Sequence, residues 1–205
     1  MTVLIVARHG NTFEPGEPPR RIGQRTDLPL TARGIEHGRN LGAYLKKINL
    51  LPSRIYTSEL RRTRQMAECV NESAGINLPP QSMPMFNELD YGPDENQTED
   101  KVIARIGESA MSDWEEKAIM PQGWSPDPQT IARRWKDFAD HIAATQPDSV
   151  VLVITSNGIA RFALGLGGDF EGACRSFGPK LATGGFGVLE HDGQNWQIQS
   201  WNVRP

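Results

Sequence analysis

The chain begins with an apolar run, Val3-Leu4-Ile5-Val6-Ala7, that leads directly into Arg8-His9-Gly10-Asn11-Thr12. Five consecutive apolar residues that include β-branched types predict a strand buried on both faces of a parallel sheet. In α/β proteins, ligands bind beyond the carboxyl ends of such strands. The guanidinium, imidazole and hydroxyl that follow this strand therefore predict a site that binds an anion. An ordinary charged junction between strand and loop is the alternative interpretation of these residues alone.

Segments with strand and helix patterns alternate along the rest of the chain. The expected strands are 2–7, 54–57, 149–155, 184–190 and 195–201, and the expected helices are 31–49, 58–74, 98–118, 128–145 and 157–166. Asp192-Gly193 suits a type I′ turn and predicts that the last two strands form a hairpin. We therefore expect an α/β fold: a three-layer sandwich with a mostly parallel central sheet, an antiparallel edge and helices on both faces.

The length of 205 residues suits one domain with a sizeable core. The stretch 93–128 is richer in Pro, Gly, Asp and Glu than its surroundings. We interpret this stretch as an excursion over the sheet edge that forms a lid on the site, and not as a second domain.

Charge and cysteine content exclude several classes of protein. A net charge of −3 gives no electrostatic signature for nucleic acid. Cys69 and Cys174 have no paired spacing, which fits a reducing compartment, and the histidines and cysteines lack metal-ligand spacing. No apolar stretch has the roughly 20 residues of a membrane span, and the first apolar run is too short for a signal peptide. We expect a soluble cytoplasmic protein that binds neither nucleic acid nor membrane.

Four signatures follow one another along the chain. They are R-H-G-x-T at 8–12, G-x-x-x-D-x-P-L-T-x-x-G at 23–34, S-x-L-x-R-x-x-Q-x-A at 58–67, and Asn87-Glu88-Leu89-Asp90-Tyr91-Gly92. In this order and at these separations, they resemble the histidine phosphatase superfamily, the phosphoglycerate-mutase-like group. The resemblance covers most of the chain. It implies phosphoryl transfer through a phosphohistidine, without a metal or other cofactor.

The first signature supplies the candidate nucleophile and phosphate-binding groups. The resemblance makes His9 the nucleophile, and an imidazole with a pKa of about 6.5 offers a neutral nitrogen at physiological pH. The planar guanidinium of Arg8 suits phosphate oxygens. Gly10 would let a ligand approach the backbone closely. Asn11 and Thr12 are further candidates for phosphate binding.

The third signature places a second arginine near the same anion. We expect Ser58 to cap a helix, so that Arg62 lies in its first two turns. The helix dipole and the guanidinium would then favour one bound anion together. The S-x-L-x-R spacing selects Arg62, and we expect Arg61 and Arg64 to form a solvated basic face.

The family's general acid corresponds to Glu88. Apolar neighbours on both sides disfavour the charged form of its carboxyl group, as a general acid requires. Asp90 and Glu95 are the alternatives. Arg20 or Arg21, in the loop before Gly23, would add substrate contacts, and Arg20 has the better spacing.

The chain departs from the family pattern at the segment 155–161. The family has a second histidine there, in a phrase like S-H-G-G-x-x-R, where this chain reads Thr-Ser-Asn-Gly-Ile-Ala-Arg. Ser156 occupies the histidine position, or Asn157 does after a one-residue slip. Either side chain still donates a neutral hydrogen bond, so the exchange would cost about 1–3 kcal/mol, or roughly 10- to 100-fold in rate. His37, His141 and His191 are poor substitutes because they fall in predicted helices and a turn.

These residues predict a metal-independent phosphomonoester hydrolase acting on a small phosphorylated metabolite. His9 would attack phosphorus, Glu88 would protonate the leaving group and then activate water, and Arg8, Arg62 and Ser156 would hold the oxygens. The alternatives are a phosphate-ester-binding module with little turnover and a phosphoglycerate-type mutase. Specificity is expected from the segments 13–22 and 93–128.

Overall fold

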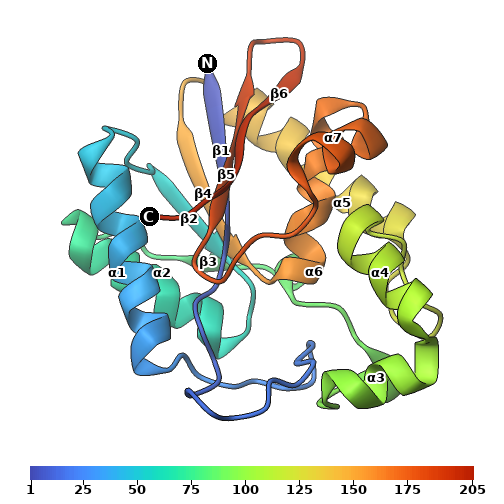
Figure 1. Cartoon of the computed structure of the whole chain (residues 1–205). Helices are drawn as coiled ribbons and strands as arrows, with labels where there is room; N and C mark the ends of the chain where they lie inside the picture. The colour runs from blue at the N-terminus through green and yellow to red at the C-terminus, as the bar shows by residue number, and fades with distance from the viewer.

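A computed structural model describes all residues from 1 to 205 and contains one six-stranded sheet, in the order β3-β2-β4-β1-β5-β6 (Figure 1). The strands are β1 (Thr2–Arg8), β2 (Arg54–Thr57), β3 (Gln81–Ser82), β4 (Val150–Thr155), β5 (Phe186–His191) and β6 (Trp196–Val203). The first four run parallel, whereas β5 is antiparallel to β1 and β6 is antiparallel to β5. The prediction of a mostly parallel sheet with an antiparallel edge is confirmed.

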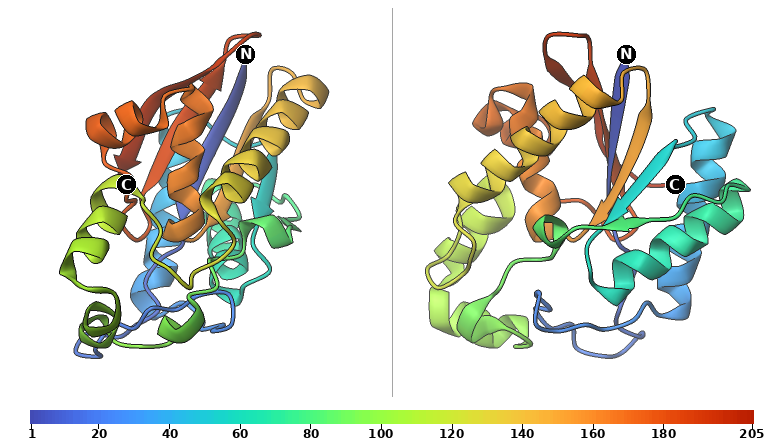
Figure 2. Two further views of the ribbon diagram at one scale, coloured as in Figure 1. Left: turned by 90° about the vertical axis from the view of Figure 1, so that its right-hand side faces the viewer. Right: turned by 180° about the vertical axis from the view of Figure 1, so that it is seen from behind.

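Helices cover both faces of the sheet, as the two further views in Figure 2 also show. One face carries α1 (Ala32–Lys47) and α2 (Arg61–Ala74); the other carries α3 (Glu99–Ile106), α4 (Glu108–Lys117), α5 (Pro128–Thr145), α6 (Asn157–Ala160) and α7 (Phe170–Phe177). No helix combines the length and the apolar character that a membrane crossing would need.

Side chains along β1 point alternately to the two faces of the sheet and contribute to a hydrophobic core on each face. Val3, Ile5 and Ala7 pack in a cluster with residues of α1 and α2, whereas Leu4 and Val6 belong to the cluster on the opposite face. All five are buried, with exposed fractions of 5% or less. Strand β1 is therefore covered on both faces, as its continuous apolar run predicts.

Two predicted helices are interrupted. The helix expected at 98–118 is divided into α3 and α4 at Gly107, whose φ of 86° is one that glycine adopts without strain. The helix expected at 157–166 is α6 followed by a 3₁₀ helix, Arg161–Gly167. Strand β3 and helix α7 were not predicted, because segments of two and eight residues carry too little periodicity.

Two local predictions are wrong in detail. The residue that caps α2 is Leu60 and not Ser58, although Oγ of Ser58 accepts a hydrogen bond from the Leu60 N–H at 3.2 Å. The hairpin between β5 and β6 exists, but four residues connect its strands. Oδ1 of Asp192 accepts from the N–H groups of Gln194 and Asn195, each at 2.8 Å, and this local bonding replaces a two-residue type I′ turn.

The parallel strands end at one edge of the sheet, at the lower end in Figure 1. Arg8 of β1 pairs with Thr155 of β4, and Thr57 of β2 pairs with Ile154. The loop after β1 crosses beneath this edge. Segments that are distant in sequence therefore meet at the carboxyl end of β1, next to residues 8–12.

Candidate active site

A cavity of about 320 Å³ opens at this edge, and most of the predicted site residues line it. Those that do are Arg8, His9, Asn11, Thr12, Arg20, Glu88 and Asn157. Gly10, Arg62 and Ser156 do not line the cavity. Only four of the seventeen lining residues are hydrophobic, so the cavity suits a polar ligand.

Both ring nitrogens of His9 form hydrogen bonds, and the residue is only 6% exposed. Nδ1 lies 2.8 Å from the carbonyl oxygen of Gly10, which can only accept, so Nδ1 donates. Nε2 accepts a hydrogen bond from Nε of Arg62 at 3.1 Å. The ring is therefore neutral, with its proton on Nδ1 and its lone pair on Nε2.

The surroundings of His9 favour this neutral form. Burial lowers its pKa well below the usual value, and the positive charges of Arg62 and Arg8 lower it further. The hydrogen bond to Gly10 opposes these effects but is the smallest of them. An unprotonated Nε2 is what nucleophilic attack requires.

Arg62 is fully buried beneath His9. Its Nη1 donates to the carbonyl of Thr26 at 2.8 Å, and its Nη2 donates to that of Gly23 at 3.2 Å. The carboxylate of Glu95 accepts from the Gly23 N–H at 2.9 Å and from Oγ1 of Thr26 at 2.6 Å. Glu95 thus shapes the loop that holds Arg62, which leaves it unsuited to act as the alternative general acid.

Arg8 is the second cation that acts on His9. Its Nη1 donates to the carbonyl of Leu181 at 2.8 Å, while its Nε is buried without a partner. Burial lowers the pKa of Arg8, although Glu88 opposes this effect. Neither Arg8 nor Arg62 forms an ion pair with a carboxylate. Positive charge that is not paired with a carboxylate creates a field that favours an anionic ligand.

Of the three candidates for the general acid, Glu88 is the one that lines the cavity. It is 5% exposed, and its carboxyl oxygens accept from the N–H groups of Leu89 at 2.9 Å and Gly158 at 3.1 Å. Burial and the nearby charge of Glu88 together raise the pKa of Tyr91. Asp90, by contrast, does not line the cavity and forms an ion pair with Arg25 at 3.0 Å.

Of the two candidates for the second-histidine position, Asn157 lines the cavity. Its Oδ1 accepts from the Leu181 N–H at 2.9 Å, which leaves the amide NH₂ group as a free donor. Oγ of Ser156 is buried and has no hydrogen-bond partner. His9 is the one histidine among the lining residues, and no group of three or more His, Cys, Asp or Glu side chains could hold a metal ion.

Gly10 has a role that the sequence did not indicate. A Cβ atom at this position would overlap the backbone of Gly34 in α1, so the close approach is to the protein and not to a ligand. Helix α1 can therefore pack directly against the loop that carries His9.

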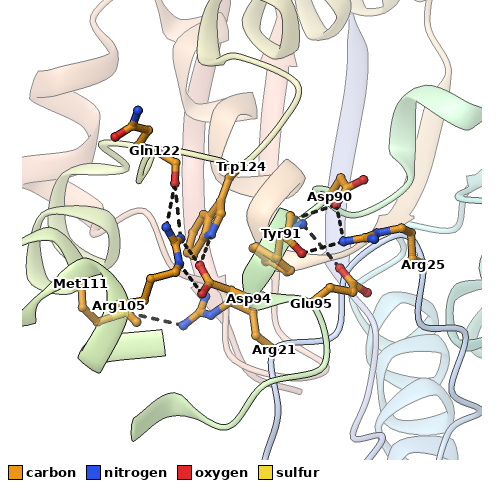
Figure 3. A network of polar contacts seen from close by, with 11 residues as sticks. Arg21, Arg25, Asp90, Tyr91, Asp94, Glu95, Arg105, Met111, Gln122 and Trp124 are labelled. Atoms are coloured by element: carbon orange, nitrogen blue, oxygen red, sulfur yellow. Dashed lines mark hydrogen bonds and ion pairs between the residues drawn. The ribbon is translucent and has the colours of Figure 1, made fainter. Parts of the chain in front are cut away.

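Arg20 and Arg21 both line the cavity, and their surroundings differ. Arg20 is exposed and lies over the ring of Phe13 at 5.6 Å. The guanidinium of Arg21 lies 5.3 Å from the ring centroid of Tyr91 and 5.0 Å from that of Trp124 (Figure 3). Arg21 is thus the more firmly held of the two, which spacing alone did not indicate.

A polar cluster around the buried side chains of Asp94 and Trp124 fixes the segment 93–128 next to these residues (Figure 3). Asp94 is 2% exposed and accepts hydrogen bonds from Arg105 and, at 2.6 Å, from Nε1 of Trp124. Arg105 also donates to the carbonyl of Gln122 at 3.3 Å. The segment contributes Glu99, Trp114 and Glu115 to the cavity, and Glu115 forms an ion pair with Lys180 at 2.7 Å. The sequence predicted that this segment contributes to specificity, but no signature contains Glu99 or Glu115, so neither was singled out.

The fold and the site together define an α/β protein whose cavity is lined by a buried neutral histidine, an arginine and a carboxyl group, with a second, buried arginine bonded to the histidine. The profile of the Histidine phosphatase superfamily (branch 1) matches residues 4–204, so the chain belongs to this superfamily.

Individual relatives agree with this assignment. The chain is 26% identical over 209 residues to an uncharacterized phosphatase, PhoE, of Bacillus subtilis, with 99% of this chain and 95% of that protein covered. A mycobacterial glucosyl-3-phosphoglycerate phosphatase has a TM-score of 0.82 at 20% identity, covering 99% of each chain. An alpha-ribazole phosphatase of Shigella flexneri has a TM-score of 0.75 at 22% identity, covering 98% of this chain and 96% of that one. The two structures show that the fold is shared.

Proposed function

We propose that this protein is a metal-independent phosphomonoester hydrolase that acts on a small phosphorylated metabolite through a phosphohistidine at His9. The observation that carries the proposal is the neutral ring of His9, whose Nε2 lone pair lies beside Arg62 in the cavity that Arg8 and Glu88 also line. The relatives named as phosphatases of glucosyl-3-phosphoglycerate and alpha-ribazole phosphate support a small metabolite as the substrate.

The first step forms a bond from Nε2 of His9 to phosphorus while the ester P–O bond breaks. The hydrogen bond from Arg62 to Nε2 opens in this step, and its N–H then faces the phosphoryl oxygens, which Arg8 also holds. Glu88 in its protonated form gives its proton to the leaving oxygen. In the second step Glu88 accepts a proton from water, which attacks phosphorus, releases inorganic phosphate and restores His9.

The place of the second histidine is taken by neutral groups in this proposal. The free amide of Asn157 donates to a phosphoryl oxygen, while Ser156 lies behind it, outside the cavity lining. Replacing a charge-assisted hydrogen bond by a neutral one lowers the rate by about 10- to 100-fold. Turnover persists because the nucleophile, the acid and both arginines remain.

The test is a search for the covalent intermediate. The protein is mixed with a ³²P-labelled phosphomonoester that it hydrolyses, quenched in alkali and assayed for an acid-labile phosphoryl group. We expect label on the wild type and on His141→Ala, an exposed histidine in α5, and none on His9→Ala. Hydrolysis by a wild type that never carries label would contradict the mechanism.

A phosphate-ester-binding module with little turnover is the second candidate. It is favoured by the presence of a single histidine in the cavity lining. A screen of phosphate esters in the presence of a chelator separates the two functions. Binding of esters with hydrolysis no faster than for His9→Ala would establish the binding module, whereas hydrolysis that needs His9 would establish the enzyme.

A further inference from the structure

A second cavity, of about 200 Å³, lies between α1 and the C-terminal end of the chain. Figures 1 and 2 show this end beside α1 in each view. Arg33, His37 and Asn40 enter the cavity from one face of α1, at the i, i+4 and i+7 positions. Ala182, Thr183, Gly184, Arg204 and Pro205 complete the lining.

The polar side chains of this cavity have no partners within the protein. Nδ1 of His37 is buried and makes no hydrogen bond. Burial and the charge of Arg33 lower the pKa of His37, although Glu36 opposes them. Arg33 and Arg204, which are exposed, and Thr183 make no side-chain hydrogen bond within the protein either, so their donors are available to a ligand.

The side chains that line this cavity carry positive charge, and the one carboxylate among the lining residues is the terminal group of Pro205. Two arginines line it, and none of the lining side chains is acidic. No carboxylate, that of Pro205 included, lies within ion-pair distance of Arg33 or Arg204. Guanidinium groups and a hydroxyl are the donors that bind phosphate oxygens.

One short segment forms the wall between the two cavities. Thr183 lines both of them. The N–H of Gly184 donates to the carbonyl of His9 at 3.2 Å, and the carbonyl of Leu181 accepts from Arg8. Gly184 has a φ of 75°, and a Cβ atom there would overlap the side chain of His37. The same segment therefore contacts both the nucleophile and the second cavity.

From these observations we infer a second binding site for a phosphate-type oxyanion, either inorganic phosphate or the phosphate group of a small ester. Arg33 and Arg204 bind the anion, Asn40 and Thr183 complete its hydrogen bonds, and the site shares the 182–184 wall with the catalytic cavity.

The test is a titration of ¹⁵N-labelled protein followed by NMR. The wild type is titrated with inorganic phosphate, and His9→Ala is titrated with glycerol 3-phosphate, which that variant cannot turn over. The backbone amides of Asn40 and Arg204 report on the second cavity alone, because neither residue lines the first. We expect saturable shifts of both amides with at least one of the two ligands, and the tighter ligand identifies the source of the phosphate group.

Matched variants distinguish binding at a specific site from nonspecific attraction of an anion to positive surface charge. We expect Arg33→Gln combined with Arg204→Gln to weaken the binding reported by Asn40 by about tenfold or more. Arg39→Gln removes a charge from the same helix outside the cavity and should change this binding less than about twofold. Unsaturable shifts with both ligands, or equal affinity in the double variant and the wild type, would overturn the inference. Since the readout is binding, it is independent of phosphatase activity.

Discussion

Nε of Arg62 donates a hydrogen bond to Nε2 of His9 across 3.1 Å. The guanidinium group is therefore hydrogen-bonded to the nitrogen that we propose as the nucleophile. This contact is possible only while Nε2 is unprotonated, because the guanidinium has no acceptor. In the proposed mechanism, Arg62 aligns the ring and keeps its lone pair available until a phosphoryl group takes the place of the N–H donor.

The first prediction concerns the ionisation of His9. Burial, Arg62 and Arg8 lower its pKa well below the usual value, so the ring should stay neutral at pH values where an exposed histidine is protonated. We expect ¹⁵N NMR of the imidazole to show the neutral Nδ1–H form at pH 6. The variant Arg62→Gln should move the pKa of His9 back toward about 6.5. Protonation of wild-type His9 near pH 6.5 would contradict the assignment.

The lowered pKa of His9 also makes the free energy of unfolding depend on pH. Because the folded-state pKa of His9 is lowered, the unfolded chain binds more protons below about pH 6.5, and the folded state loses stability as the pH falls through that range. His9→Gln removes this dependence. Urea unfolding at pH 7.5 and 5.5 should therefore show a smaller loss for His9→Gln than for the wild type.

The second prediction concerns Gly158, whose N–H binds the Glu88 carboxylate at 3.1 Å. A Cβ atom at this position would overlap Oε1 of Glu88. Gly158→Ala should displace the acid and lower kcat by about 100-fold for an ester with a poor leaving group. The loss should be smaller for p-nitrophenyl phosphate, whose leaving group does not need a proton.

Gly165→Ala is the matched control for this substitution. It lies in the 3₁₀ helix Arg161–Gly167, and a Cβ atom there would meet Phe170 at an ordinary 3.7 Å. Its activity should equal that of the wild type. An equal loss with both esters in Gly158→Ala would show that the substitution perturbs more than the acid.

The third prediction distinguishes the two candidates for the second-histidine position. Asn157→Asp keeps the acceptor for the Leu181 N–H but replaces the free amide by a negative charge facing the cavity. We expect kcat/KM to fall by about 100-fold or more, since the like charge repels the phosphate. Ser156→Ala removes a hydroxyl without a partner and should change kcat/KM less than about threefold. The reverse order of effects would assign the position to Ser156.

The fold could be predicted because its signals are local and repeated. The apolar runs of β1 and β4 define the buried centre of the sheet, and the signatures identify Arg8 and His9 at the end of β1 and Glu88 in the loop that follows β3. Arg61 and Arg64 are exposed while Arg62 is buried, as the spacing indicated. These assignments needed only periodicity and the order of motifs.

Other features depend on contacts between distant segments, which no local pattern encodes. The structural role of Glu95 follows from its bonds to Gly23 and Thr26, more than sixty residues earlier in the chain. The choice between Ser156 and Asn157 depends on Leu181, which lies beside them only in the fold. The break at Gly107 depends on a backbone angle that the sequence permits but does not require.

The last prediction concerns the cluster that anchors the segment 93–128. Burial alone would raise the pKa of Asp94, but hydrogen bonds from Arg105 and Trp124 outweigh it and hold this pKa below the usual value. The stabilisation is thus present above about pH 4 and is lost as the pH falls through the lowered pKa. Asp94→Asn should reduce the free energy of unfolding by about 1–3 kcal/mol at pH 7, because a buried charged acceptor is lost.

Asp113→Asn is the control, since it breaks the exposed i,i+4 ion pair with Lys117 in the same segment. It should change the free energy of unfolding by less than about 0.5 kcal/mol. Urea unfolding at pH 7 and at about pH 2.5 measures both variants, and the difference between Asp94→Asn and the wild type should shrink at the lower pH, below the unfolded pKa of Asp94. If Asp94→Asn were as stable as Asp113→Asn at pH 7, the cluster would contribute nothing beyond a surface pair, and the segment would be anchored by the packing of Trp114 and Trp124 alone.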